Sequence, residues 1–163
     1  MKTKLINAIR ETIIDLETGR KHYEYTDCHN CNCGILAQNI CHISAWALEK
    51  AFEPCSEIWE GAVRCSSTGE PLQKILKQMY SVGLTKKNIQ NLEMLSDKKI
   101  CKEAGIKVGQ RYDDKKYLLM YLSAWLRILE REQPKEVKPE PEYRTVVIDS
   151  KVKELTQETI SLS

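Results

Sequence analysis

The chain has 163 residues, and its 42% hydrophobic and 29% charged residues are typical of a globular protein rather than a disordered or fibrous one. The formal net charge of +2 excludes a strong overall attraction to nucleic acid or to membrane surfaces. No segment approaches the roughly 20 apolar residues of a membrane-spanning helix, and the first residues lack the apolar stretch of a signal peptide. We therefore expect a cytoplasmic protein that contacts no membrane and for which nucleic acid is not the favoured partner.

Apolar residues recur every three or four positions along the first third of the chain, which is typical of amphipathic helices. We expect one helix over residues 3–18, ended by Gly19 in the left-handed conformation that glycine adopts easily. A second helix is predicted over residues 33–51, with Asn32 as its N-cap.

The middle of the chain carries clearer signals for the ends of helices. Pro71 fits the first turn of a helix over residues 70–80, with Ser67 and Glu70 as a capping box. Gly83, followed by Leu84, is predicted to end this helix. Further helices are predicted to begin after Thr85, over residues 97–104 after Ser96 and before a stop at Gly105, and from Asp113 or Asp114 to about 132. The apolar face of the last helix is predicted to consist of Leu118, Tyr121, Leu122, Trp125, Ile128 and Leu129. The aromatic residues on the helical stripes are predicted to lie in the core: Trp46, Trp59, Tyr117, Tyr121 and Trp125.

Composition changes at Gln133. Residues 134–142 alternate proline with charged residues, as extended linkers do, and residues 143–148 (YRTVVI) have the composition of a strand. We therefore predict an all-α domain of five to six helices over residues 1–132, followed by an extended C-terminal arm over residues 133–163. Because a lone strand needs a partner, the arm either adds one β-strand, mediates a homodimer or binds a protein partner.

The most unusual feature is the turn Cys28-His-Asn-Cys-Asn-Cys-Gly34. It contains the C-x2-C spacing that is the commonest half of a zinc site, since zinc binds thiolates and imidazoles in tetrahedral number. Seven cysteines in a chain without a signal peptide favour free thiols or a metal over a disulfide framework. The expected metal ligands are Cys28, Cys31 and Cys33. Cys65 is added because it lies in a polar loop, where a purely packing role for a small apolar side chain is less expected.

A second interpretation makes Cys33 a reactive thiol. It would sit at the start of a helix, where free backbone N–H groups favour a thiolate. Catalysis would need a base, and no histidine follows His42, whereas cysteine peptidases place theirs later in the chain. Cys33 is therefore the sole catalytic candidate and no catalytic set is predicted. The alternative is simple packing, because Cys33 continues the apolar stripe of Leu36 and Ile40; Cys41 and Cys101 are also expected in the core.

Residues 97–122 offer a third interpretation, a DNA-binding helix-turn-helix with lysines nearby. Against it, Asp113 and Asp114 would repel phosphate where a reading helix should begin. Residues 105–111 also resemble the late part of a sterile-alpha-motif domain. The carboxylates of Glu93 and Asp97 are expected to be solvated.

Taken together, residues 31–38 (CNCGILAQ), Trp59, the Cys65 loop and residues 92–97 (LEMLSD) resemble a family of small uncharacterised bacterial proteins with a Cys-Asn-Cys-Gly-x-Leu-Ala-Gln motif. The similarity covers most of residues 1–130. It implies that Cys31, Cys33 and Cys65 belong to one site, and it implies no activity.

The predicted functions are therefore two main alternatives. The first is a metal- or thiol-active site between the 28–34 turn and the 65–69 loop, for which zinc is the candidate metal. The second is a protein-interaction or self-association module with purely structural cysteines. DNA binding through residues 97–122 is a further alternative.

Overall fold

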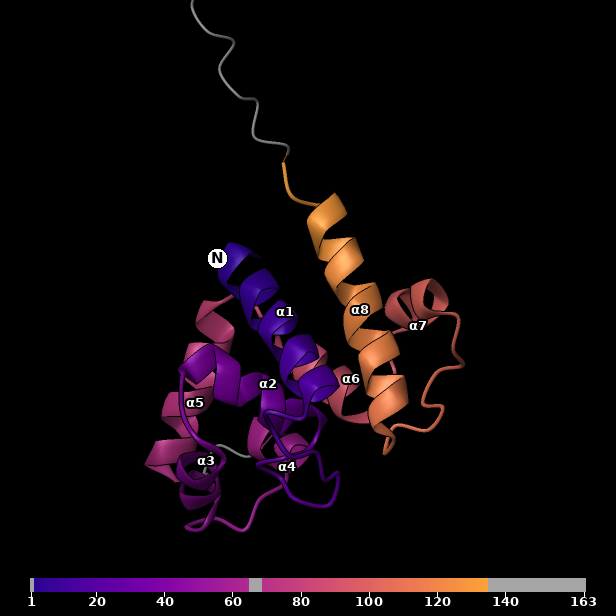
Figure 1. Cartoon of the computed structure of the whole chain (residues 1–163). Coiled ribbons are helices and arrows are strands. Elements are labelled where there is room, and N and C mark those ends of the chain that lie inside the picture. Colours follow the sequence, from indigo (N-terminus) through magenta and orange to yellow (C-terminus); the bar gives the residue numbers. More distant parts are fainter. Residues whose placement is uncertain (1, 65–68, 135–163) are drawn as a thin grey trace, which may run out of the picture. The chain divides into compact units, whose positions relative to one another are not determined.

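The computed structural model of the protein describes residues 2–64 and 69–134 (Figure 1). The regular secondary structure of this part is all α-helical, which confirms the predicted all-α class, but the predicted five to six helices are too few. Eight helices are present in the described residues: α1 (Lys2–Thr18), α2 (Asn32–Cys41), α3 (Ala45–Phe52), α4 (Trp59–Arg64), α5 (Glu70–Ser81), α6 (Lys86–Met94), α7 (Lys98–Ala104) and α8 (Lys115–Arg131).

All eight helices belong to Met1–Gln133, one of two units into which the chain divides, and the other unit begins at Pro134. The C-terminal arm predicted over 133–163, with its strand at 143–148, lies outside the described residues from position 135 onward. None of the described helices combines the length and hydropathy that a bilayer crossing requires.

The predicted second helix is in fact two helices. α2 ends at Cys41, and His42 adopts a left-handed backbone conformation with φ 53° and ψ 45°. Ser44 then caps α3, because its side chain accepts a hydrogen bond of 3.1 Å from the backbone N–H of Ala47. The prediction of one helix over residues 33–51 was wrong because neither glycine nor proline marks this break.

The break also changes which side chains of α3 are buried. Leu48, Ala51 and Phe52 form the buried face of this helix, whereas Trp46 is 66% exposed. The prediction of a core position for Trp46 was wrong because it extended the stripe of α2 into α3. The predictions for Trp59, Tyr121 and Trp125, which are all buried, are confirmed.

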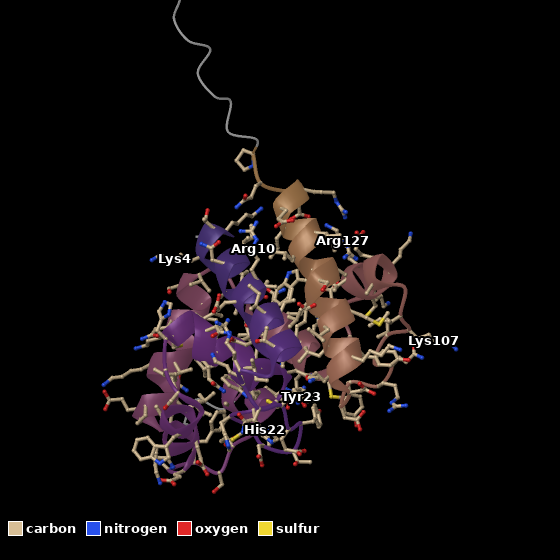
Figure 2. All side chains as sticks on the ribbon, in the orientation of Figure 1. Lys4, Arg10, His22, Tyr23, Lys107 and Arg127 are labelled. Carbon is tan, nitrogen blue, oxygen red and sulfur yellow. The ribbon has the colours of Figure 1, made fainter. Side chains whose placement is uncertain are left out.

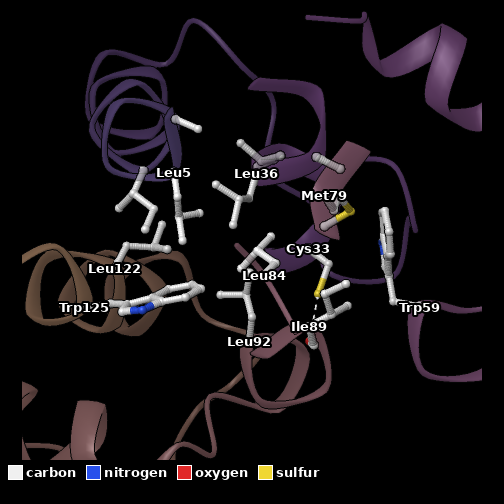
Figure 3. Close-up of a cluster of buried hydrophobic side chains, with 14 of the residues drawn as sticks. Leu5, Cys33, Leu36, Trp59, Met79, Leu84, Ile89, Leu92, Leu122 and Trp125 are labelled. Atoms are coloured by element: carbon white, nitrogen blue, oxygen red, sulfur yellow. Dashed lines mark hydrogen bonds between the residues drawn. The ribbon is translucent and has the colours of Figure 1, made fainter. Parts of the chain in front are cut away.

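The core gathers around α2 and α8. α2 packs against α1, α3, α5 and α6, and α8 packs against α1 and α7. Figure 3 shows Leu5 of α1, Leu36 of α2, Leu92 of α6 and Leu122 of α8 converging on one apolar cluster. The six apolar positions predicted to face inward on the last helix are all buried: Leu118, Tyr121, Leu122, Trp125, Ile128 and Leu129.

Most predicted helix ends of the second half are confirmed. Gly83 has a φ of 101°, and the N–H of Leu84 bonds back to the Met79 carbonyl at 3.4 Å. Thr85 forms a reciprocal capping box with Asn88 at the start of α6. Asp114 caps α8 by accepting from the N–H of Lys116.

Two predicted caps differ from the structure. Asp97 caps α7, accepting from Lys99 and Ile100 at 2.9 and 3.1 Å, while the Ser96 hydroxyl donates to the side chain of Asn91. A carboxylate is the stronger acceptor for free N–H groups, and it displaces the cap by one residue. The N-cap of α5 is Gly69, and its predicted capping partner Ser67 lies outside the described residues.

Candidate functional site

The thiol turn is the end of a closed loop that leads into α2. The N–H of Asp27 bonds to the Glu24 carbonyl at 3.2 Å, and that of Asn30 to the Asp27 carbonyl at 2.9 Å. The N–H of Glu24 in turn bonds to the Asn30 carbonyl at 3.1 Å. These bonds satisfy the backbone of a segment without regular structure, so the cysteines that follow are held in defined positions.

Gly34 is required by the packing of this loop. A Cβ atom at position 34 would lie 2.5 Å from the carbonyl carbon of His29 and 2.6 Å from the carbonyl oxygen of Cys28. Both atoms belong to the backbone, which cannot rotate away as a side chain can. The first turn of α2 therefore touches the loop at a distance that only glycine permits.

Asn32 joins the thiol turn to the second half of the chain. Its side-chain N–H groups are shared among the carbonyls of Leu92, Glu93 and Tyr112 at 3.2, 3.0 and 2.8 Å, and its oxygen accepts from the Tyr23 hydroxyl at 2.8 Å. The prediction of Asn32 as the N-cap was wrong: Cys31 occupies that position, and Asn32 is the first residue of α2.

Cys33 lies inside the core. Its side chain has no exposed surface, and its thiol donates to the Ile89 carbonyl of α6 at 3.3 Å (Figure 3). Burial raises the pKa of this thiol well above its usual value, and the neighbouring Cys31 and Glu93 act in the same direction. This environment disfavours the thiolate that a nucleophile or a metal ligand needs.

Cys31 is buried as well. Its thiol donates to the Cys28 carbonyl at 3.4 Å. Burial raises the pKa of Cys31 to about 12, although the backbone N–H groups of Gly34 and Cys33 act in the opposite direction. The helix start therefore provides N–H donors to Cys31 and not to Cys33, for which they were predicted, and the cost of burying a charge outweighs them.

Cys28 and Cys55 are half-buried cysteines at the edge of this region. Burial raises the pKa of the Cys28 thiol, and the nearby Asp27, Glu49 and Cys55 act in the same direction. The Cys28 carbonyl accepts from the indole N–H of Trp59 at 2.7 Å, which anchors the turn to α4. The Cys55 thiol donates to the carbonyl of Phe52, whose ring meets that of Trp59 at 5.1 Å.

The predicted metal ligands are not brought together in the part of the chain that the structure describes. Within residues 2–64 and 69–134, no three side chains of His, Cys, Asp or Glu gather as metal ligands would. Cys33 bonds into α6 and Cys31 bonds back to its own loop, while Cys65 lies outside the described residues. The described cysteines also form no disulfide with one another.

Glu93 is a partly buried carboxylate that the sequence did not reveal. One of its oxygens, Oε2, is buried and has no hydrogen-bond partner in the described residues. Burial raises its pKa, as does the charge of Glu60, against the effect of the Glu60 backbone N–H at the start of α4. The prediction of a solvated Glu93 overlooked its spacing of four residues from the buried Ile89, which places both on one face of α6.

The DNA-binding interpretation receives little support from the geometry of residues 97–122. α7 and α8 are joined by residues 105–114, far longer than the turn of three or four residues in a helix-turn-helix. Lys99 is paired with Glu132 at 2.6 Å, and Arg111 with Asp114 at 3.0 Å. Basic side chains lie on several different elements rather than along one, as the labelled Lys4, Arg10, Lys107 and Arg127 show in Figure 2.

Comparison with known proteins gives no independent indication of function. The chain matches no protein-family model, no curated protein and no solved structure. The resemblance to a bacterial family with a Cys-Asn-Cys-Gly motif therefore stays a prediction.

Proposed function

We propose that the protein is a helical self-association module whose cysteines stabilise the fold. The observation that carries this proposal is the exposure of Trp46 on α3, at 66%, together with Ile58 just before α4, at 60%. These are the two most exposed large apolar side chains in the described residues. Large exposed apolar groups are costly to leave in water, and tryptophan is the residue most enriched at the energetic centres of protein interfaces.

The state of the buried thiols supports a structural role for the cysteines. Cys31 and Cys33 are both buried, both donate to backbone carbonyls, and both have a raised pKa. Protonated thiols in such surroundings act as small apolar groups with a weak donor. The unusual cysteine motif is then explained by the packing of the loop against α2 and α6.

The charges around Trp46 favour a second copy of the chain as the partner. The ammonium group of Lys50 lies 5.6 Å from the centre of the Trp46 ring and 2.6 Å from the carboxylate of Glu53. A two-fold interface brings a surface patch against itself, so a patch with both signs of charge can pair with its own copy. The net charge of +2 adds little repulsion between two copies.

Light scattering over a concentration series tests the proposal. We expect the wild-type chain to reach the mass of a dimer, and Trp46→Ser to raise the dissociation constant about tenfold or more, since interface anchors of this kind contribute roughly 2 kcal/mol. Ile14→Ser is the matched control, because Ile14 is an exposed apolar residue on α1. A wild-type chain that stays monomeric at every concentration, or a control that dissociates equally, would show the proposal to be wrong.

The predicted C-terminal arm needs a separate variant in this experiment, because the arm lies outside the described residues from position 135 onward. A chain that ends at Gln133 should remain dimeric if the surface around Trp46 is sufficient. If this truncation abolishes the dimer while Trp46→Ser does not, the arm carries the interface instead.

A second candidate keeps a zinc site but moves its centre to Cys28 and Cys55. It is favoured by one observation: these two thiols are only half buried, unlike Cys31 and Cys33, and Cys55 contributes to the raised pKa of Cys28. They supply two of four tetrahedral ligands. Elemental analysis should then find zinc in the purified protein, lost in Cys28→Ser and Cys55→Ser but kept in Cys101→Ser, whose thiol is buried against the Leu95 carbonyl. Protein purified without chelator and free of zinc would eliminate this candidate.

A further inference from the structure

A cavity of about 640 Å³ lies between α1 and the C-terminal ends of α2 and α5. No residue of the thiol turn and no residue of α3 lines it. The volume falls within the range of roughly 300–1,000 Å³ that is usual for small-molecule sites. The apolar part of its lining is Ala8, Ile40 and Val82, and the small side chain of Ala8 leaves open the space that a longer residue would fill.

One end of the cavity presents unused donors. Lys4, near the N-terminal end of α1 in Figure 2, forms no ion pair with any residue that the structure describes. Gln78 lines the cavity from α5, and its side-chain amide has no hydrogen-bond partner among those residues. Gln78 belongs to the last turn of α5. This end of α5 lies near the start of α1, where Lys4 is, because Gly83 and Leu5 line one neighbouring cavity.

His42 adds a second observation at the rim. It ends α2 with a φ of 53°, a conformation that glycine or asparagine adopts at a lower cost. Its ring is exposed at the cavity and makes no hydrogen bond to the part of the chain that the structure describes. The imidazole is therefore a third group at the cavity that can donate a hydrogen bond to a ligand.

A partly buried polar network lies beside the cavity. Asn39 donates to Thr12 and Asp15 at 2.9 and 3.0 Å and accepts from Lys21. Asp15 is almost fully buried and pairs with Arg20 at 2.8 Å and with Lys21 at 3.3 Å. Because these bonds tie α1 to α2, the cavity keeps its shape when empty, which lowers the entropic cost of binding.

The charges around the cavity decide which ligand it suits. Its acidic residue, Glu11, lies seven residues from Lys4, or about 10 Å along α1. Glu11 is already paired with Arg20 at 2.7 Å, so its charge is partly neutralised. The free cation and donors at the other end therefore set the preference for an anion.

We propose that this cavity binds a small organic anion. Its carboxylate or phosphate group accepts hydrogen bonds from Lys4, Gln78 and His42, and its apolar body packs on Ala8, Ile40 and Val82. This site is independent of the self-association proposed for the surface around Trp46, and either can fail without the other.

Titration of the ¹⁵N-labelled full chain with benzoate and with phenyl phosphate tests the proposal, with benzyl alcohol as the uncharged probe. We expect saturable shifts at the backbone amides of Ala8, Asn39 and Val82, and at least tenfold weaker binding of benzyl alcohol. Comparing the two anions shows whether the head group is a carboxylate or a phosphate.

Three variants separate the proposed contacts from general effects. Lys4→Gln should weaken binding about tenfold, the usual effect of losing a hydrogen bond to a charged group. Lys77→Gln, which removes the same charge from an exposed position of α5 outside the cavity lining, should not. His42→Gly should weaken binding while raising thermal stability, because glycine relieves the backbone strain.

Two results would overturn the proposal. One is the absence of saturable shifts at the cavity with either anion. The other is an equal loss of affinity in Lys4→Gln and Lys77→Gln, because binding would then follow net charge alone. Opposite effects of His42→Gly on stability and binding cannot arise from unfolding of the variant.

Discussion

At the residue scale, the side-chain amide of Asn32, rather than any cysteine, joins the thiol turn to the rest of the fold. Asn32 has no exposed surface and meets three carbonyl oxygens with one side-chain NH₂ group. All three acceptors lie at the end of α6 or in the loop before α8. A side chain of the same shape that lacked these donors would face oxygen atoms only, and buried polar groups without partners are costly.

Asn32→Asp is therefore expected to be strongly destabilising, by about 3 kcal/mol or more, because it places a carboxylate against three carbonyl oxygens without changing the size of the side chain. Urea denaturation followed by circular dichroism measures the loss. Asn88→Asp makes the same chemical change in the capping box of α6, where a carboxylate still accepts from Thr85. That control should be neutral or slightly stabilising. Equal losses in the two variants would show that the network of Asn32 is not special.

The sequence could predict part of this site and not the rest. The burial of Cys33 follows from its place on the stripe of Leu36 and Ile40, since helix periodicity is a local property. The role of Asn32 does not, because its acceptors are 60 to 80 positions away in the chain. A local rule made it an N-cap, and only the packing of α2 against α6 shows where its side chain bonds.

At the scale of the helices, features set by neighbouring residues were again predictable from the sequence, and features set by tertiary packing were not. Ends marked by glycine or by a capping side chain were predictable, as at Gly83, Thr85 and Gly105, because those residues act on the backbone next to them. The break between α2 and α3 was not, since His42 carries a strain that tertiary packing has to offset. The apolar stripe continued through the break and predicted one helix.

Asp97 is the N-cap of α7, a helix of seven residues, and replacing it measures how much one cap contributes to the stability of the fold. We expect Asp97→Ala to lower the free energy of unfolding by about 1 kcal/mol, because two N–H groups in the first turn lose their acceptor. Asp113→Ala removes the same charge from an exposed residue that caps no helix, and should change stability little. Thermal denaturation of both variants gives the comparison, and a neutral Asp97→Ala would mean that solvent replaces the cap.

At the scale of the whole molecule, the all-α class followed from composition and periodicity, which sum over many residues and tolerate local errors. The arrangement of the helices in space could not be predicted in this way, because it depends on which helix faces pack against one another. The burial of polar groups is the clearest case: Asn32, Asp15 and Glu93 are ordinary surface residue types. Only the packing of α1, α2, α4 and α6 buries Asn32 and Asp15 and covers one carboxylate oxygen of Glu93.

Burial of many weak acids makes the stability of the molecule depend on pH on the alkaline side. Burial raises the pKa of Cys31 to about 12, of Cys41 to about 11, and of Tyr23 above its usual value. In the unfolded chain, thiols titrate near pH 8.5 to 9. Between that pH and the raised values, the folded chain binds more protons than the unfolded chain, so stability is complete below about pH 8.5 and falls as the pH rises toward 11 and 12.

We therefore expect the free energy of unfolding to decrease by up to about 1.4 kcal/mol per pH unit for each buried thiol above pH 9. Urea denaturation under reducing conditions at pH 7, 8, 9 and 10.5 measures the slope. In Cys31→Ala, stability at pH 7 falls because a packed side chain is lost, but the slope above pH 9 should become shallower, since one buried acid is gone. An unchanged slope in this variant, or a wild-type stability that is flat up to pH 10.5, would show that the thiol turn reaches water and titrates normally.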